Sequence, residues 1–362
     1  MEEQDQVIEG LVKLSGAMLN EIEKLKEDNV SLRTRIEQLE GTVQKLLSLQ
    51  KDTIETIQKN QHEVIMMGKT MQRGLSNIPY ELGMGEVPAP KVASVEETVS
   101  KIVNEHAGIA RFGDGEFSIM MGNSRQGFQK QDDRLAQRLR EVIESNDPNF
   151  MIAIADNYGV LKQYSDLSQN EIRYYMTEEV RMGHNIFLNP ERCYYNAYMT
   201  TPYMLYADRQ TEGPAKRFSA LKKIWEDRNL IIIEGELSRL GVGNDLFAAT
   251  KSIKRILGPA EHAYDKYDSI LSAAVAEGKN VSEPLFIIAL GPTATVLAYD
   301  LHKAGFQAVD MGHIDNDYEY FLRKANDRFA IPGKYVNNIT QKDDVAQVND
   351  EDYLAQIVKK IL

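Results

Sequence analysis

A heptad repeat over residues 8–53 limits the folds open to this chain more than any other pattern in it. β-Branched residues recur at the first apolar position and leucine at the second, which favours a parallel two-stranded coiled coil. A polar residue at one first position, Asn29, helps to fix register and strand number. The first positions are Ile8, Ser15, Ile22, Asn29, Ile36, Val43 and Gln50, and the second are Leu11, Met18, Leu25, Leu32, Leu39, Leu46 and Thr53.

Charges flanking the repeat favour pairing of identical chains. In a parallel dimer the facing pairs are Glu21–Lys26, Asp28–Arg33 and Arg35–Glu40, all of opposite sign. We therefore predict a coiled coil over residues 1–73 that forms a homodimer. The alternative is a single long helix folded back on the rest of the chain.

The rest of the chain divides by composition. Residues 74–92 contain three prolines and three glycines, which predicts a linker. A globular domain over residues 93–334 is expected to follow, beginning with a capping box at Ser94 and Glu97. Residues 335–362 are polar apart from Tyr353–Val358, so we expect a peripheral C-terminal segment.

Apolar runs alternate with helical stretches in the globular part. These runs are typical of strands buried on both faces, and their alternation with helices predicts an α/β fold. The expected architecture is a Rossmann-like, mostly parallel sheet flanked by helices, with ligands at the carboxyl ends of the strands. The runs are 107–110, 150–155, 230–233, 285–290 and 308–311.

Composition limits the kinds of ligand and partner that this chain can bind. A net charge of −12 argues against a surface that coats nucleic acid, because phosphate backbones need basic patches. The single cysteine, Cys193, excludes an intramolecular disulfide and a cysteine-based zinc site. The polar N-terminus and the lack of a run of 18 apolar residues predict a cytoplasmic protein without a transmembrane segment.

The hexapeptide Arg111–Glu116 follows the first apolar run and has the composition of a metal and phosphate site. If it is extended, Asp114 and Glu116 project to the same side and offer oxygen ligands to a divalent cation. Gly113 and Gly115 let an anion approach the backbone, and Arg111 offers phosphate donors. The alternative is a glycine-rich turn with a solvated acidic rim.

Polar residues follow the other runs as well. They predict a ligand site assembled from several strand ends, although Gly291–Thr295 is equally compatible with an ordinary helix start. Tyrosines around Asn196 suit stacking on a sugar or base, or a half-buried core. The candidates are Asp156, Asn157, Asn196, Arg239, Gly243, Asn244, Asp245, Gly291, Thr293 and Thr295.

The last run is followed by titratable residues at every second position: His313, Asp315, Asp317 and Glu319. One of them is a candidate general base for an acceptor hydroxyl. His313 with Asp315 is alternatively a second metal site, and each acid is alternatively a helix cap or a solvated charge.

With these residues in view, the globular part resembles the bacterial glycosyltransferases of the GT-D fold, formerly a conserved domain of unknown function. The matching stretches run in order from about residue 95 to about 330. They are Arg111–Glu116, Asn196 with Pro202–Met204, Glu234–Glu236 with Ser238–Phe247, Leu290–Thr295, and Gly312–Asp315 with Tyr318–Glu319. The coiled coil lies outside the resemblance.

The resemblance implies a metal-dependent enzyme that uses a UDP-sugar, with glucose as a candidate sugar and Mn²⁺ or Mg²⁺ as the metal. It assigns Asp114 and Glu116 to the metal and the sugar-nucleotide diphosphate. It implies a glycan acceptor in surface glycoprotein or polysaccharide biosynthesis. Separately, a coiled coil of roughly 50 residues extends about 75 Å, long enough for peripheral association of two catalytic domains with a membrane-bound acceptor or with other glycosyltransferases.

Two other functions remain open from the sequence. One is a coiled-coil scaffold that displays an inactive nucleotide-binding domain. The other is a different transferase that uses nucleotide phosphates, although the absence of a Gly-x-x-x-x-Gly-Lys-Ser/Thr loop counts against a P-loop enzyme.

Overall fold

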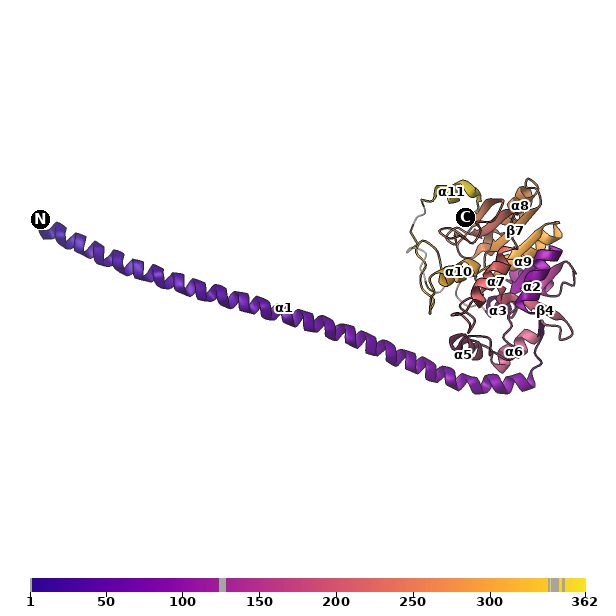
Figure 1. Cartoon of the computed structure of the whole chain (residues 1–362), viewed down its shortest axis with the longest axis horizontal. Coiled ribbons are helices and arrows are strands. Elements are labelled where there is room, and N and C mark those ends of the chain that lie inside the picture. Colours follow the sequence, from indigo (N-terminus) through magenta and orange to yellow (C-terminus); the bar gives the residue numbers. More distant parts are fainter. Residues whose placement is uncertain (1, 124–127, 338, 340–344, 347–348) are drawn as a thin grey trace. The chain divides into compact units, whose positions relative to one another are not determined.

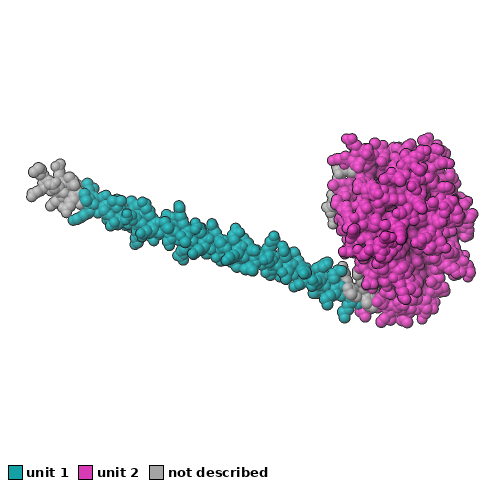
Figure 2. All heavy atoms as spheres, in the orientation of Figure 1, with its two compact units in different colours: residues 1–72 teal, residues 73–362 magenta. Residues whose placement is uncertain are grey.

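The computed structural model of the chain describes residues 2–123, 128–337, 339, 345–346 and 349–362. The chain divides into two compact units, residues 1–72 and 73–362 (Figure 2). Among the described residues, no helix is both long and apolar enough to cross a lipid bilayer.

Helix α1 runs from Glu2 to Glu86 (Figure 1). Its part up to Gln72 forms the first unit, and its last turns, from Arg73, belong to the second unit. This confirms the predicted long helix. Its heptad seam is apolar yet exposed in the single chain: the large apolar residues from Leu11 to Leu46 at these positions are 48–65% exposed. In a single isolated helix this apolar stripe packs against nothing and adds no stability. Helix propensity alone therefore does not explain why the repeat is present.

The predicted linker over residues 74–92 is wrong for most of its length, because α1 continues to Glu86 and contains Pro79. A proline inside a helix removes one backbone hydrogen bond and usually kinks or ends the helix. Here the packing of the next residue offsets the lost hydrogen bond, since Tyr80 is buried at 1% exposure in the core of the second unit. The globular unit therefore begins at Arg73 and not near Val92.

The second unit is built on a sheet of nine described strands in which every strand pairing is parallel. Their order is β1-β4-β3-β2-β8-β7-β5-β6-β9. The strands are β1 (Lys91–Val92), β2 (Gly108–Phe112), β3 (Phe150–Ile154), β4 (Cys193–Asn196), β5 (Asn229–Gly235), β6 (Ser252–Gly258), β7 (Pro284–Ala289), β8 (Gln307–Asp310) and β9 (Ile357–Lys360).

Helices lie on both sides of this sheet (Figure 1). They are α2 (Val95–Glu105), α3 (Asp114–Met120), α4 (Asp133–Ile143), α5 (Asp166–Tyr175), α6 (Glu178–Asn185), α7 (Gly213–Lys222), α8 (Tyr267–Gly278), α9 (Pro292–Lys303), α10 (Ile314–Leu322) and α11 (Glu351–Gln356), with short 3₁₀ helices η1 (Ala197–Thr200) and η2 (Ala263–Lys266). The predicted capping box at Ser94 and Glu97 begins α2.

Alternate residues of each central strand enter opposite cores, because successive side chains point to opposite faces of a sheet. In β5, Ile231 and Ile233 pack with α8 and α9, whereas Leu230 and Ile232 pack with α2, α7 and α10. Both faces of these strands are covered, which explains their continuous apolar runs and confirms the predicted α/β architecture.

The sequence did not reveal all the strands. In β6, Lys254 and Arg255 interrupt the apolar pattern, and the buried Arg255 is tolerated because it pairs with Glu234 on β5 at 2.5 Å. The short strands β1, β4 and β9 carry too few apolar residues to be recognised in advance.

Residues 335–362 are not peripheral as expected, as far as they are described. Strand β9 extends the sheet beside β6, and Tyr353 of α11 is 4% exposed, with its ring 5.0 Å from the Arg255 guanidinium. The backbone N–H of Tyr335 donates to the Leu237 carbonyl at 2.8 Å. The segment therefore closes one side of the fold.

Candidate active site

The strand order reverses at β2 and β8, and the region at the carboxyl ends of these two strands is called the crevice, after the usual position of ligands in such folds. The chain proceeds from β2 to β3 and β4 on one side, while β8, β7 and β5 lie on the other side. Ligands of open parallel sheets bind at such a reversal of strand order. The residues after β2 begin α3, and those after β8 lead into α10, so both predicted motifs reach this crevice.

Asp114 and Glu116 are not extended, because Asp114 is the first residue of α3. Residues two apart are separated by about 200° around a helix, so the two side chains do not leave the backbone on one side. Glu116 instead folds back, and its carboxylate accepts a hydrogen bond from the Gly113 N–H at 2.7 Å. The predicted side-by-side arrangement is therefore wrong in its geometry, although both acids lie at the mouth of the crevice.

The Glu116 carboxyl lies in an unfavourable electrostatic environment. Burial raises the pKa of Glu116 to about 7, against the effect of backbone hydrogen bonds, and the Asp310 and Asp114 charges raise it further. A bound cation would relieve this repulsion, and the hard carboxylate oxygens suit Mg²⁺ or Mn²⁺. The donor set therefore fits a divalent cation.

Arg111 is engaged by the protein itself. Its guanidinium donates to the Asp310 carboxylate at 2.8 Å, to the Asp310 carbonyl at 2.9 Å and to the Thr200 hydroxyl at 2.9 Å. Gly312 allows this approach, since a Cβ there would lie 2.4 Å from the guanidinium. Arg111 therefore ties the ends of β2 and β8 together, and Asp310 is a site residue that the sequence analysis missed.

The start of α9 lies against the start of α3. A Cβ added to Gly115 would lie 3.7 Å from the Pro292 ring, so the backbones approach closely. Gly291 caps α9 with a φ of +54°, and a Cβ there would lie 2.5 Å from the Phe128 ring. Thr293 and Thr295 are fully buried, and the Thr295 hydroxyl donates to the Arg111 carbonyl at 3.0 Å. The threonines brace the two motifs rather than face a ligand.

His313 reaches the same crevice from β8. Although the residue is exposed, desolvation by neighbouring atoms and the charges of Arg111 and Arg328 lower the pKa of His313 to about 4. Its imidazole is therefore neutral at pH 7.

The loop after β3 forms another wall of the crevice. Burial raises the pKa of the Tyr198 phenol above its usual value, a hydrogen bond with Asn157 lowers it, and the Asp114 and Asp156 charges raise it further. The Tyr164 hydroxyl donates to the Asp156 carbonyl at 2.7 Å. Tyr198 therefore lies within electrostatic range of both Asp114 and Asp156.

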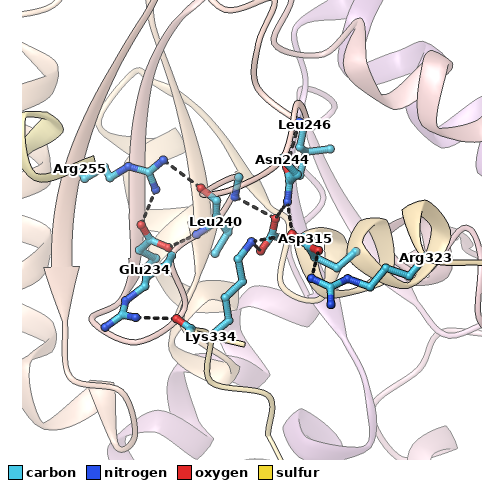
Figure 3. Close-up of polar contacts among 12 residues, drawn as sticks. Glu234, Leu240, Asn244, Leu246, Arg255, Asp315, Arg323 and Lys334 are labelled. Carbon is cyan, nitrogen blue, oxygen red and sulfur yellow. Dashed lines mark hydrogen bonds and ion pairs between the residues drawn. The ribbon is translucent and has the colours of Figure 1, made fainter. Parts of the chain in front are cut away.

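Asp315, a candidate base, lies in a polar network with Asn244 and Lys334 (Figure 3). Glu319, a second candidate base, belongs to the same network. The Lys334 ammonium is 2.6 Å from the Asp315 carboxylate and 3.3 Å from that of Glu319. The Asn244 amide donates to both carboxylates at 2.8 Å. Burial opposes ionisation of Glu319, but the Asn244 hydrogen bond and the Lys334 charge hold its pKa below the usual value. Asp315 and Glu319 therefore hold the loop after β5 in place through these bonds.

Asp317, on another face of α10, also forms hydrogen bonds within the protein. Its carboxylate accepts hydrogen bonds from the backbone N–H groups of Tyr203 at 2.6 Å and Met204 at 3.1 Å. Burial outweighs these bonds and raises the pKa of Asp317 to about 7. Asp317 thus supports the turn after η1.

The remaining candidates around the β5 loop also bond within the protein. Arg239 donates to the carbonyls of Gly333 at 2.6 Å and Ala346 at 2.7 Å. Asp245 accepts from Lys222 at 2.9 Å and from the Tyr318 hydroxyl at 2.6 Å. Gly243 adopts a φ of +79°, which glycine tolerates without strain.

Asn196 and two of its tyrosine neighbours are structural. The Asn196 side chain caps η1 by accepting from the Tyr198 N–H at 3.0 Å, and donates to the Ala93 carbonyl at 3.2 Å. Tyr194 and Tyr203 are core residues at 1% and 2% exposure. The core interpretation of the cluster therefore holds for these two.

A second metal site at His313 and Asp315 is not supported. Within the described ranges, no group of three or more His, Cys, Asp or Glu side chains is placed to hold a metal ion, so a cation at Asp114 and Glu116 would also need ligands from water or substrate. Both Asp315 oxygens are occupied by Gly241, Asn244 and Lys334.

The sequence model described as "Glycosyltransferase GT-D fold" matches residues 109–339, which include the crevice and the buried network. The chain belongs to the GT-D glycosyltransferases. The matched region confirms the resemblance drawn from the motifs, and it excludes α1.

Similar GT-D proteins come from streptococci. The chain is 34% identical over 285 residues to "Probable glycosyl transferase Gly" of Streptococcus gordonii, which covers 78% of this chain and 40% of the relative. It is 31% identical over 277 residues to "Glycosyltransferase GlyD" of Streptococcus pneumoniae, covering 75% of this chain and 33% of the relative. The chain thus spans well under half the length of these two relatives.

Solved GT-D structures have the same fold. One, described as a domain of unknown function 1792 with a distinct glycosyltransferase fold, has a TM-score of 0.71 at 30% identity and covers 78% of this chain and 100% of its own. Another, described as a new glycosyltransferase from Streptococcus sanguinis, has a TM-score of 0.69 at 33% identity and covers 76% of this chain and 100% of its own.

Proposed function

We propose that this GT-D protein transfers a sugar from a UDP-sugar, with glucose as the first candidate, to a glycan acceptor. The observation that carries the proposal is the meeting of two features at one strand switch point: the carboxylates of Asp114 and Glu116, and the start of α9 beside Gly115. Carboxylates suit the metal, and a helix N-terminus suits the diphosphate.

Asp114 and Glu116 would hold Mn²⁺ or Mg²⁺ together with diphosphate oxygens of the donor. Two carboxylates suffice, because such cations commonly keep water and substrate oxygens as their other ligands. The metal would supply charge neutralisation for the departing diphosphate. Arg111 would hold the ends of β2 and β8 in register, and so keep the start of α3, which carries both acids, beside the donor.

His313 is the best of the four candidate bases. Asp315, Asp317 and Glu319 are buried and accept several hydrogen bonds each, whereas His313 is exposed and neutral at pH 7. A general base needs contact with the acceptor hydroxyl. Of these four residues, His313 is the one that an acceptor can reach without unfolding α10.

Binding of UDP, measured by calorimetry with and without Mn²⁺, tests the proposal. We expect binding that requires the metal, since the diphosphate and the two acids are all negatively charged. Absence of binding in both conditions would contradict a UDP-sugar site, and would favour either another nucleotide or the scaffold function.

We also propose that α1 pairs with α1 of a second copy as a parallel coiled coil. The exposed apolar seam and the complementary pairs Glu21–Lys26, Asp28–Arg33 and Arg35–Glu40 support this. The pair would hold two catalytic units near a surface-glycan acceptor, including one attached to the cytoplasmic side of a membrane.

Removal of residues 1–72 should convert a dimer into a monomer that still binds UDP, as measured by light scattering and calorimetry. A catalytic unit alone should fold, because the solved relatives consist wholly of the matched part. Leu32→Lys, in the seam, should also give monomers, whereas Thr34→Lys, on the outer face, should not. A truncated protein that stays dimeric would place the interface in the second unit.

A further inference from the structure

Tyr80, near the end of α1, is hydrogen-bonded to the loop that follows β3. The Tyr80 hydroxyl lies 3.0 Å from the Asn157 carbonyl and 2.7 Å from the Gly159 carbonyl, and its proton is shared between them. Both oxygens belong to the loop that follows β3. Tyr80 lies more than 75 residues earlier in the chain, so this contact is tertiary.

A buried arginine contacts both this loop and Tyr80. Arg181 of α6, 1% exposed, donates to the Tyr158 carbonyl at 2.7 Å, and its guanidinium lies 4.4 Å from the centre of the Tyr80 ring. Three consecutive carbonyls, those of residues 157–159, are therefore fixed by two side chains that stack on each other. Because a cation over an aromatic face is attractive, the pair also stabilises itself.

The same loop lies next to the candidate site, because it follows β3, which pairs in parallel with β2 up to Phe112 and Ile154. The hydroxyl of Tyr158 lies 2.7 Å from Nδ1 of His184, whose ring stacks on Phe117 of α3 at 3.9 Å. The loop is thus linked to α3, the helix that carries Asp114 and Glu116.

We propose that Tyr80 is a positioning residue for sugar transfer, and that it acts by fixing the loop 156–160 against the crevice. This rests on the proposed function of the crevice. It also assigns a role to the end of α1, which lies outside the matched family region at 109–339. Displacing a wall of a catalytic site by a fraction of an ångström reduces turnover even when no catalytic group changes.

The test is Tyr80→Phe in the full chain. This variant keeps the ring and its contact with Arg181, and removes only the hydroxyl that fixes the Asn157 and Gly159 carbonyls. We expect the kcat for UDP-glucose hydrolysis to fall about tenfold. We also expect faster amide hydrogen exchange in residues 157–161, with an unchanged exchange rate in the strands β5 and β7.

The matched control is Tyr174→Phe on α5 of the same unit, where the tyrosine is 58% exposed. It should leave kcat and the exchange of residues 157–161 unchanged. Wild-type exchange in Tyr80→Phe, or faster exchange with wild-type kcat, would overturn the proposal. Failure of the proposed function is distinguishable, because it appears as a wild-type protein that does not bind UDP.

Discussion

Asp114→Asn should reduce sugar transfer by roughly a hundred- to a thousandfold, while the free energy of unfolding stays close to that of the wild type. The residue is exposed at the first turn of α3, so the fold depends little on it. In the proposed mechanism its carboxylate holds the metal that neutralises the leaving diphosphate. Release of UDP from UDP-glucose, measured at saturating Mn²⁺, gives the rate, and urea denaturation gives the stability.

Glu116→Gln should have a similar effect on transfer, and here the chain offers a close control. Glu116 and Glu97 each accept a hydrogen bond from the N-cap residue of their own helix, at 2.7 Å from Gly113 and 2.8 Å from Ser94. Glu97→Gln therefore makes the same chemical change in the capping box of α2, and should leave the rate unchanged. Full activity of both Asp114→Asn and Glu116→Gln would remove the metal site from the proposal.

Lys334→Met should destabilise the second unit by about 3–5 kcal/mol, because it leaves the buried Asp315 carboxylate without a cation and Glu319 with Arg323 alone. Lys334 is 4% exposed and contacts both Asp315 and Glu319. Its methylene chain is replaced by one of similar size, so little packing is lost. Urea denaturation of the wild type and the variant at pH 7 measures the difference.

Lys216→Met is the control for the loss of a lysine charge. Lys216 pairs with Glu212 one turn away on the surface, with side chains 77% and 86% exposed. Such a pair contributes less than about 1 kcal/mol. If Lys334→Met costs no more than this control, Asp315 and Glu319 do not depend on Lys334, and their assignment as structural residues fails. Recovery of stability in Lys334→Met with Asp315→Asn would locate the effect in the network.

The sequence predicted the architecture well because the central strands are buried on both faces. Such strands need continuous apolar residues, and these are visible in β3, β5 and β7. Residue types at the strand ends were equally informative, since metal and phosphate chemistry requires acids and glycines. The heptads predicted α1 for a similar reason, because an apolar period of 3.5 residues is characteristic of helices that pair along a seam.

The sequence analysis failed where a residue's role depends on a distant partner. Lys334 gives no local signal, since its partners Asp315 and Glu319 lie on α10. Tyr80 stands next to Pro79 in a stretch with the composition of a linker, and only its contacts with Asn157, Gly159 and Arg181 show why the helix continues. Asp315 and Glu319 look like free acids until Lys334 and Asn244 are placed beside them.

The pairing of β2 with β8 has a consequence for how the protein is made. Arg111 and Asp310, which tie these neighbouring strands together, are 199 residues apart in the chain. During synthesis at about 5–20 residues per second, β2 therefore waits at least about ten seconds for β8. Helix α1 needs no later part of the chain to expose its heptad seam. In the proposed dimer, we therefore expect nascent chains to pair through α1 before either catalytic unit has closed its sheet.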